Sequence, residues 1–302
     1  MDVAVTGSSG LIGSRLVREL AADGHRVVRL VRPGSADRDT TGTEDAEWDP
    51  TAGTIDTAAL AGVDAVVHLA GASIADSRWT PEQKDRIMSS RRLGTTLLAR
   101  TLAELRTPPG VLLSGSAIGW YGDTGDHPTD ESGPAGHDFP AEVCKVWEAS
   151  AAPAADAGVR VAYLRTGIVL DDAGGALAKQ LPFFKLGLGG RSGSGRQYQS
   201  WITLRDHVAA IRFLLTSELS GPVNLTAPEP VQNREFASTL GRVLGRPTTI
   251  IPMIGPRLLY GRELADSLLL TSQRVIPKAL DDAGFAFQDR TLEPALRNVL
   301  DR

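Results

Sequence analysis

The sequence has little cysteine: Cys144 is the only one in 302 residues. An intrachain disulfide is therefore excluded, and the composition fits a reducing compartment, so we expect a cytoplasmic location. The sequence also has no apolar run long enough to span a membrane and no signal peptide before its first expected strand, so we expect no membrane partner.

Excess positive charge is missing too. The formal net charge is −4, from 32 basic and 36 acidic residues, so no nucleic-acid partner is indicated.

Metal-ligand spacing is likewise missing among the histidines, cysteines and carboxylates, so no metal site is expected. Hydrophobic residues make up 42% of the chain and charged residues 23%, which is ordinary for a globular protein. A chain of this length can bury a large core, either in one large domain or in one domain with a smaller lobe.

A glycine-rich turn lies close to the start of the chain. Residues 3–6 form a short apolar run, glycines follow at 7, 10 and 13, and apolar residues then recur with a helical period over 11–22. Gly7 permits a tight turn, Gly10 lets the backbone approach phosphates, and Gly13 lets the helix pack on its strand. The positive end of the helix would face the pyrophosphate of a dinucleotide. The alternative is a purely structural turn.

The second expected strand, residues 26–32, lies at the distance that a βαβ unit requires. In such units an acidic residue at the strand end binds the ribose of NAD, whereas a cation there binds the 2′-phosphate of NADP. Here Arg32 ends the strand, Arg29 precedes it by three residues, and no acid takes that place. A guanidinium can hold a phosphate through two parallel hydrogen bonds, so NADP(H) is favoured. The alternative is that Arg32 is a solvated residue at the strand end.

Strands alternate with helices up to Gly167, which predicts an α/β fold with a Rossmann-type doubly wound parallel sheet. Beyond Gly167 this rhythm breaks, and residues 171–200 are rich in glycine. We expect residues 1–167 to form the NADP-binding domain, rejoined by about 198–226. Residues 168–197 and 227–302 would form a smaller C-terminal α/β lobe that binds substrate over the carboxyl ends of the strands.

Several segments along the whole chain form a recognisable set: residues 6–13, 68–71, 78–80, 90–91, 119–122, 139–148, 193–206 and 273–278. Together they resemble the extended short-chain dehydrogenases/reductases. More narrowly, they are similar to the atypical branch called epimerase family proteins, or sugar-nucleotide epimerase-like proteins. The resemblance implies an NADP(H)-binding Rossmann domain with a C-terminal lobe. A small-molecule substrate would bind in the cleft between the lobes, and we expect a monomer or a homodimer.

The expected cofactor contacts fall into three groups. The pyrophosphate would lie on the glycine turn and the 2′-phosphate on Arg32, and the residues of the turn concerned are Gly7, Ser9, Gly10, Leu11 and Ile12. The adenosine side would be flanked by Leu69, Ala70 and Gly71. The nicotinamide side would be flanked by Ser114, Lys145 and the 164–167 turn, which contains Arg165.

Extended members of the resembled group transfer protons with a Tyr, assisted by a Ser or Thr and by a Lys four residues after the Tyr. The Lys is needed because the free pKa of Tyr is ~10, and a nearby ammonium favours the phenolate. Lys145 matches that lysine, but Ala141 stands four residues earlier and cannot transfer a proton. Ser116 best matches the serine, and Tyr121 is expected on the loop after that strand, facing the cleft. The catalytic candidates are therefore Ser116, Tyr121 and Lys145.

For three other polar residues we expect no catalytic role. We expect His68 to be a satisfied core histidine, Glu148 to be a solvated helix carboxylate, and Cys144 to be an unreactive thiol. In the glycine-rich passage, Arg191 and Arg196 could meet an anionic group of the substrate, or the passage could be a flexible surface loop.

Taken together, the sequence predicts an NADP(H)-dependent oxidoreductase or epimerase-like enzyme that acts on an unidentified small polar substrate. The alternative is a non-catalytic NADP(H)-binding regulator or redox sensor, which Ala141 favours because a sensor does not need the tyrosine.

Overall fold

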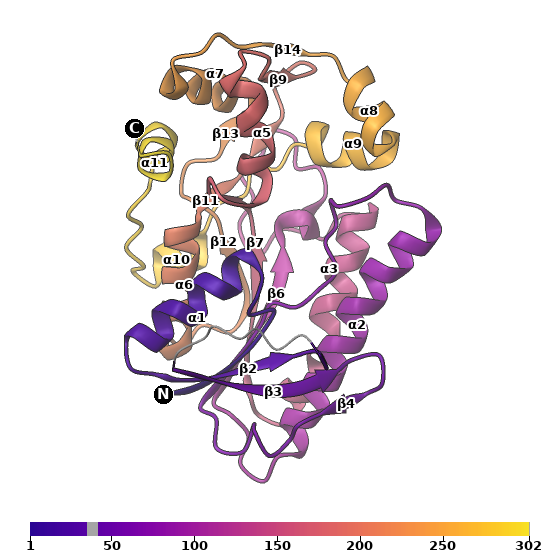
Figure 1. The fold of residues 1–302 in the computed structure, drawn as a ribbon, viewed down its shortest axis with the longest axis vertical. Helices are drawn as coiled ribbons and strands as arrows, with labels where there is room; N and C mark the ends of the chain where they lie inside the picture. Colours follow the sequence, from indigo (N-terminus) through magenta and orange to yellow (C-terminus); the bar gives the residue numbers. More distant parts are fainter. Residues whose placement is uncertain (35–41, 302) are drawn as a thin grey trace.

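The computed structural model describes residues 1–34 and 42–301, and its centre is an eight-stranded sheet (Figure 1). The strand order is β12-β7-β6-β5-β1-β2-β3-β4, and every pairing is parallel except that of β3 with β4. The bounds are β1 Asp2–Thr6, β2 Arg26–Val31, β3 Thr43–Asp49, β4 Thr54–Ile55, β5 Ala65–His68, β6 Val111–Ala117, β7 Arg160–Thr166 and β12 Gly221–Leu225. This is the predicted α/β fold of the Rossmann type.

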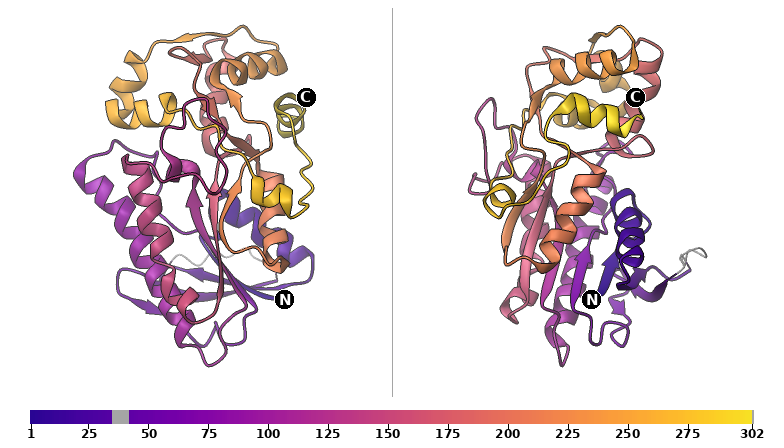
Figure 2. Two further views of the ribbon diagram at one scale, coloured as in Figure 1. Left: turned by 180° about the vertical axis from the view of Figure 1, so that it is seen from behind. Right: turned by 90° about the vertical axis from the view of Figure 1, so that its left-hand side faces the viewer.

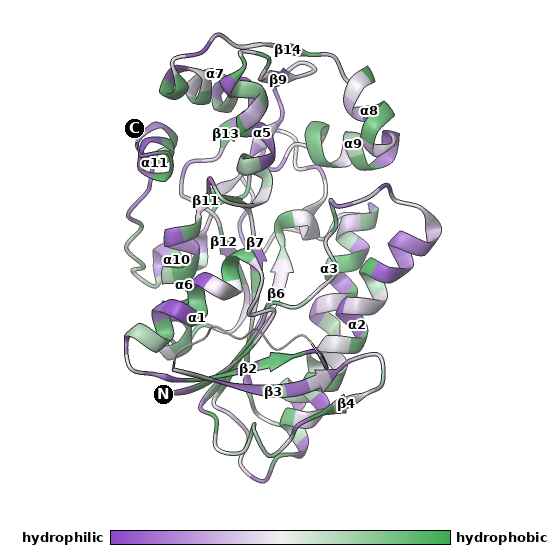
Figure 3. Ribbon diagram, viewed as in Figure 1, coloured by the Kyte–Doolittle hydropathy of each residue, from purple (hydrophilic) through white to green (hydrophobic). Residues whose placement is uncertain are grey.

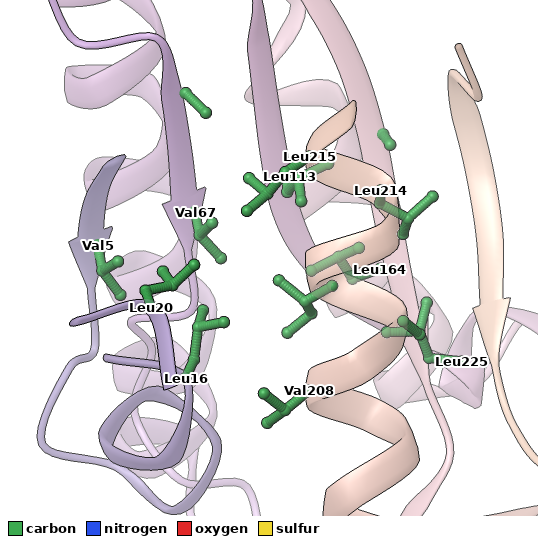
Figure 4. Close-up of a cluster of buried hydrophobic side chains, with 14 of the residues drawn as sticks. Val5, Leu16, Leu20, Val67, Leu113, Leu164, Val208, Leu214, Leu215 and Leu225 are labelled. Atoms are coloured by element: carbon green, nitrogen blue, oxygen red, sulfur yellow. The ribbon is translucent and has the colours of Figure 1, made fainter. Parts of the chain in front are cut away.

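Helices cover both faces of the sheet, α1 and α6 on one side and α2 and α3 on the other (Figure 2). Side chains alternate along a strand, so Val3 and Val5 face the α1–α6 core while Ala4 faces the α2 core. Figure 4 shows Leu16 and Leu20 in the first of these cores, close to strand residues. The helix bounds are α1 Leu11–Ala22, α2 Pro81–Glu104, α3 Phe139–Ala149, α4 Ala152–Asp156 and α6 Leu204–Thr216.

A second group of elements has its own core, which includes Phe184, Trp201 and Phe236. Its short strands pair as β8 with β11, β9 with β14, and β10 with β13. The strand bounds are β8 Ile168–Leu170, β9 Gly190–Ser192, β10 Tyr198–Gln199, β11 Trp201–Thr203, β13 Val231–Gln232 and β14 Thr249–Ile251. The helix bounds are α5 Gly175–Lys185, α7 Asn233–Leu244, α8 Ile254–Tyr260, α9 Arg262–Leu270 and α11 Leu292–Val299.

The chain crosses between the two groups of elements more than once. Helix α6 and strand β12, which lie within residues 198–226, belong to the large sheet and its core. Leu280, on α10 (Lys278–Asp282), and Phe287 also pack into that core, although they lie in the stretch proposed for the smaller lobe.

Helix α8 lies at the outside of the second group and has no buried residue. Figure 3 shows hydrophobic residues on α8 and α9, and Leu258 is 71% exposed. Polar contacts hold these helices to the segment before α2 and to its first turn. The Arg78 guanidinium donates hydrogen bonds to the carbonyl oxygens of Leu258 and Leu259, and Lys84 forms an ion pair with Glu263 at 2.7 Å.

Candidate functional site

The glycine turn joins β1 to α1 at the carboxyl edge of the sheet. Gly7 has a φ of +67°, and its carbonyl oxygen accepts a hydrogen bond from the Gly10 N–H at 3.0 Å. A Cβ on Gly13 would lie 2.2 Å from the same oxygen, so the helix packs on the turn only because Gly13 has no side chain. Gly10 is the N-cap residue of α1 and offers no side-chain cap, and the first turn of the helix has no acidic residue. Its first N–H groups and positive dipole end are therefore available to an anion, and the turn fits a pyrophosphate.

A chain of buried hydrogen bonds fixes the neighbouring loop against this turn. The Thr6 hydroxyl lies 2.7 Å from His68 Nδ1 and accepts from the Leu69 and Ala70 N–H groups, while His68 Nε2 lies 2.9 Å from the Thr95 hydroxyl. Burial, and then the charge of Arg91, lower the pKa of His68 to about 4. His68 is thus a satisfied core histidine, as predicted, and it holds the end of β5 beside β1.

Arg32 lies just beyond β2 and is exposed at the carboxyl edge of the sheet. Arg29, by contrast, is 3% exposed and forms two hydrogen bonds to Asp45 of β3, at 2.7 and 2.8 Å. Because Arg29 is buried and holds one carboxylate through two hydrogen bonds, its role is structural. Of the two arginines, Arg32 is the one whose side chain is exposed at this edge.

Ser116 and Arg165 meet at a buried carboxylate on α3. Glu148 is 6% exposed and accepts hydrogen bonds from the Ser116 hydroxyl at 2.7 Å and from Arg165 Nε and Nη2 at 2.9 and 3.0 Å. Glu148 differs here from the solvated carboxylate expected from the sequence, because β6 and β7 enclose its side of the helix. Burial alone would lower the pKa of Arg165, but its hydrogen bonds and attraction to Glu148 raise that pKa above its ordinary value.

Tyr121 belongs to the same buried network. It lies on the short 3₁₀ helix η1 (Ile118–Tyr121), its ring is 4% exposed, and its hydroxyl donates to Asn224 at 2.7 Å while accepting from Arg165 at 3.0 Å. Burial, partly opposed by the Arg165 charge, raises the pKa of Tyr121 to about 12. The structure therefore places Tyr121 in a closed network, and not on an open cleft as the sequence suggested.

Lys145 lies apart from this network. Its Nζ pairs with Glu142 at 2.7 Å, and its side chain is 31% exposed. Ala141, one turn earlier on α3, is fully buried, and its N–H is capped by Asp138 at 3.0 Å. Cys144 lies between them in the sequence and is buried, and burial followed by the Glu148 charge raises the pKa of its thiol to about 11, so an unreactive thiol stays a prediction.

Unpartnered polar atoms gather on the α2–α3 side of the carboxyl end of β6. In the described part of the chain, the buried atoms without a hydrogen-bond partner include Ser114 Oγ, Trp147 Nε1 and Arg91 Nε. Buried polar groups are nearly always paired, so these call for a ligand or bound water. With the uncapped α1 turn, they support the fit of a dinucleotide along this edge.

Arg91 is a candidate that sequence reasoning missed. It is 8% exposed on α2, its guanidinium lies 4.6 Å from the Trp147 ring, and Nη1 donates to the Ala72 and Ile87 carbonyls at 2.9 and 3.1 Å. No carboxylate pairs with it among the described residues. A Cβ on Gly71 would lie 3.3 Å from its Cζ, so this glycine gives the guanidinium its room. In the sequence, Arg91 appeared only within segment 90–91, one of the segments that resemble the family, and that segment suggested no role for it.

An open cleft of about 290 Å³ lies between α3 and α9. Trp79 and Phe139 line one side, with ring centroids 4.9 Å apart, and the other side includes Glu263, Asp266 and Leu270. The lining carries carboxylates but no arginine or lysine, and Arg191 and Arg196 lie outside it. Glu263 pairs with Lys84 and Asp266 with Arg257, so two of these carboxylates are neutralised, and no basic residue of the lining makes the anionic contact expected there.

The fold and the glycine turn thus define the class of protein, a Rossmann-type dinucleotide-binding protein. Its second group of elements borders the cleft through α9. In the described residues, no group of three His, Cys, Asp or Glu side chains could hold a metal ion. None of the helices in these parts of the chain combines the length and apolar character needed to cross a membrane.

Comparison with known proteins identifies the family. Residues 3–167 match the model of the NAD dependent epimerase/dehydratase family, and residues 251–299 match a domain of unknown function, DUF1731. An epimerase family protein of Mycobacterium tuberculosis, MT2273, is 45% identical over 97% of this chain and 96% of its own length. The Bos taurus epimerase family protein SDR39U1 is 36% identical, over 99% of this chain and all of its own.

A solved structure extends the likeness to three dimensions. The human epimerase family protein SDR39U1, crystallised with NADPH, superposes with a TM-score of 0.89 at 31% identity over the full length of both chains. The chain belongs to the NAD dependent epimerase/dehydratase family, in agreement with the resemblance read from its sequence.

Proposed function

We propose that the chain binds NADP(H) and acts as an oxidoreductase or epimerase-like enzyme on a small polar substrate in the α3–α9 cleft. The observation that carries the proposal is the uncapped glycine turn at the start of α1, with Arg32 at the end of the neighbouring strand. The human relative crystallised with NADPH supports the choice of dinucleotide. A bound nicotinamide dinucleotide would supply hydride transfer.

In this proposal the chain's residues mainly bind and orient. The N–H groups at the start of α1 would hold the pyrophosphate, and Arg32 the 2′-phosphate. Arg91 would contribute a buried positive charge next to Gly71, on the path of the dinucleotide along the carboxyl edge. Lys145, half-exposed on α3, would contact the nicotinamide ribose. Glu148 and Arg165 would keep Ser116 in one orientation through the hydrogen bonds described above.

Calorimetric titration with NADPH, NADP+ and NADH tests the cofactor assignment. The Arg32→Ala substitution removes charge-assisted hydrogen bonds, so the Kd for NADPH should rise by about 10- to 100-fold while the Kd for NADH stays the same. Arg106→Ala is the matched control, because Arg106 is exposed and lies between α2 and the start of β6, at the opposite edge of the sheet. Equal binding of NADPH and NADH, or no effect of Arg32→Ala, would contradict the proposal.

Turnover tests the enzymatic part of the proposal. The reduced nicotinamide would be followed spectroscopically with uncharged and cationic polar compounds, and any active compound retested on Ser116→Ala and Tyr121→Phe variants. Loss of turnover in Ser116→Ala would support a role for Ser116 at the reacting atoms. Full turnover in both variants would rule both residues out.

A second candidate function is a non-catalytic NADP(H)-dependent regulator. Ala141 in the place of the usual tyrosine favours it, and so does the enclosure of Ser116 and Tyr121 in a buried network. A redox sensor must bind the oxidised and reduced cofactor with different affinities, because equal binding shifts no conformational equilibrium. The same titration separates the two functions: similar affinities for NADPH and NADP+ would exclude the sensor.

A further inference from the structure

A second cavity, of about 470 Å³, lies where β9, β14 and α7 meet. Figure 1 shows these elements at the end of the molecule farthest from β2 and β3. None of its lining residues is among the residues proposed to contact the cofactor. The lining includes Arg191, Arg234, Ser238, Thr248, Thr249 and Ile250.

The fold brings the two arginine side chains together. β9 and β14 pair in parallel with Arg191 opposite Ile250, and α7 presents Arg234 and Ser238 four residues apart on one face. Gly195 lies between the arginines: a Cβ there would be 2.9 Å from Arg234 Cβ and 3.0 Å from Arg191 Cδ. Both side-chain stems therefore pack on the same glycine.

These two positive charges have no negative partner in the part of the chain that the structure describes. Arg191 Nη1 donates to the Gly193 carbonyl oxygen at 2.6 Å, and neither arginine forms an ion pair there. No carboxylate lines the cavity. Elsewhere in the same group of elements, Arg242 pairs with Glu293 and Arg257 with Asp266. Like charges held side by side repel, and an anion between them would remove that cost.

We propose that this cavity binds the phosphate group of a small molecule. A phosphate dianion matches two guanidinium groups in charge, and each guanidinium can donate two parallel hydrogen bonds to phosphate oxygens. The hydroxyls of Thr248 and Thr249 supply further donors around the same space, whereas the Ser238 hydroxyl donates to the Glu235 carbonyl oxygen at 3.0 Å. A carboxylate, with one charge and two oxygens, would satisfy one arginine only. The volume exceeds that of a bare phosphate and falls in the range of small-molecule sites, with Ile250 as an apolar wall for the rest of the ligand.

The test is calorimetric titration of the full chain with inorganic phosphate and with phenyl phosphate, each in the presence of saturating NADPH. Saturating cofactor occupies the proposed dinucleotide site, so the binding measured is not at the glycine turn or Arg32. The expected result is saturable binding of one equivalent, weakened at least about tenfold by Arg191→Gln and by Arg234→Gln. Tighter binding of phenyl phosphate than of phosphate would identify an ester as the ligand, and equal binding would identify the free ion.

Arg196→Gln is the matched control, because Arg196 lies on the same loop, is exposed, and does not line the cavity. It should leave the phosphate affinity unchanged. Arg234→Gln separates binding from folding, because this exposed side chain makes no hydrogen bond that holds the loop, and its thermal unfolding should match that of the unsubstituted chain. Absence of saturable phosphate binding, or equal weakening by Arg196→Gln, would overturn the proposal. Because NADPH binding is measured separately, failure here is distinct from failure of the proposed function.

Discussion

Replacement of Glu148 by glutamine should destabilise the protein strongly. The carboxylate is 6% exposed, Arg165 is 3% exposed, and the two share hydrogen bonds of 2.9 and 3.0 Å. Glutamine keeps the size of the side chain but removes its charge, which leaves a buried guanidinium without a counterion. Breaking a buried ion pair from one side costs about 3–5 kcal/mol, so the free energy of unfolding should fall by that order.

The control for this experiment lies on the same helix. Glu142 pairs with Lys145 at 2.7 Å, but the two side chains are 50% and 31% exposed, so Glu142→Gln should cost about 0–1 kcal/mol. Both variants would be unfolded in urea, and the free energies compared through the midpoint and the slope m. A loss for Glu148→Gln no larger than that for Glu142→Gln would refute the reasoning, because burial would then not decide the value of the pair.

Three further predictions concern the glycine turn and two buried groups. Gly13→Ala should lower both the melting temperature and the NADPH affinity, because its Cβ would lie 2.2 Å from a backbone oxygen; Gly10→Ala, at 3.3 Å, should cost less stability, and equal melting temperatures would contradict this. The free energy of unfolding should fall as the pH drops from about 6.5 to 4, because His68, with a folded pKa of about 4, stays neutral while the unfolded chain takes up a proton. His68 should account for about 3 kcal/mol of this loss of unfolding free energy. If a His68→Asn variant, unfolded in urea at several pH values, loses as much stability over this pH range as the unsubstituted chain, His68 is not the cause. Cys144, whose pKa is about 11, should react with a thiol reagent at pH 8 only after unfolding, and rapid labelling of the folded protein would refute its burial.

The sequence predicted the first half of the fold well because local rules govern it. Thr80 caps α2 and Pro81 follows in its first turn, and α3 ends at Ala149 before α4 begins at Ala152 with Pro153 in its first turn. These features depend on neighbours in sequence. The contact of Leu280 with the core of the large sheet depends on where the chain returns after β12 ends at Leu225, and no local pattern encodes it.

The site was harder to predict for the same reason. The glycine turn is contiguous in sequence and could be recognised, whereas the partners of Tyr121 are Arg165 and Asn224, which lie 44 and 103 residues away. Burial of Glu148 arises because two strands close over one side of α3, and a helical period does not distinguish that side from a solvated one. Arg91 was missed because a charged residue on a long polar helix is usually exposed.

The contact of Arg78 with helix α8 has a consequence for how this chain can vary between species. The guanidinium donates to carbonyl oxygens of Leu258 and Leu259, which every amino acid possesses, and no side chain of α8 is buried. Substitutions along α8 other than at Arg257, whose side chain pairs with Asp266, therefore leave the contact intact, whereas a change at Arg78 removes it altogether. In related chains we expect the sequence of this helix to drift widely while the arginine that holds it stays the same.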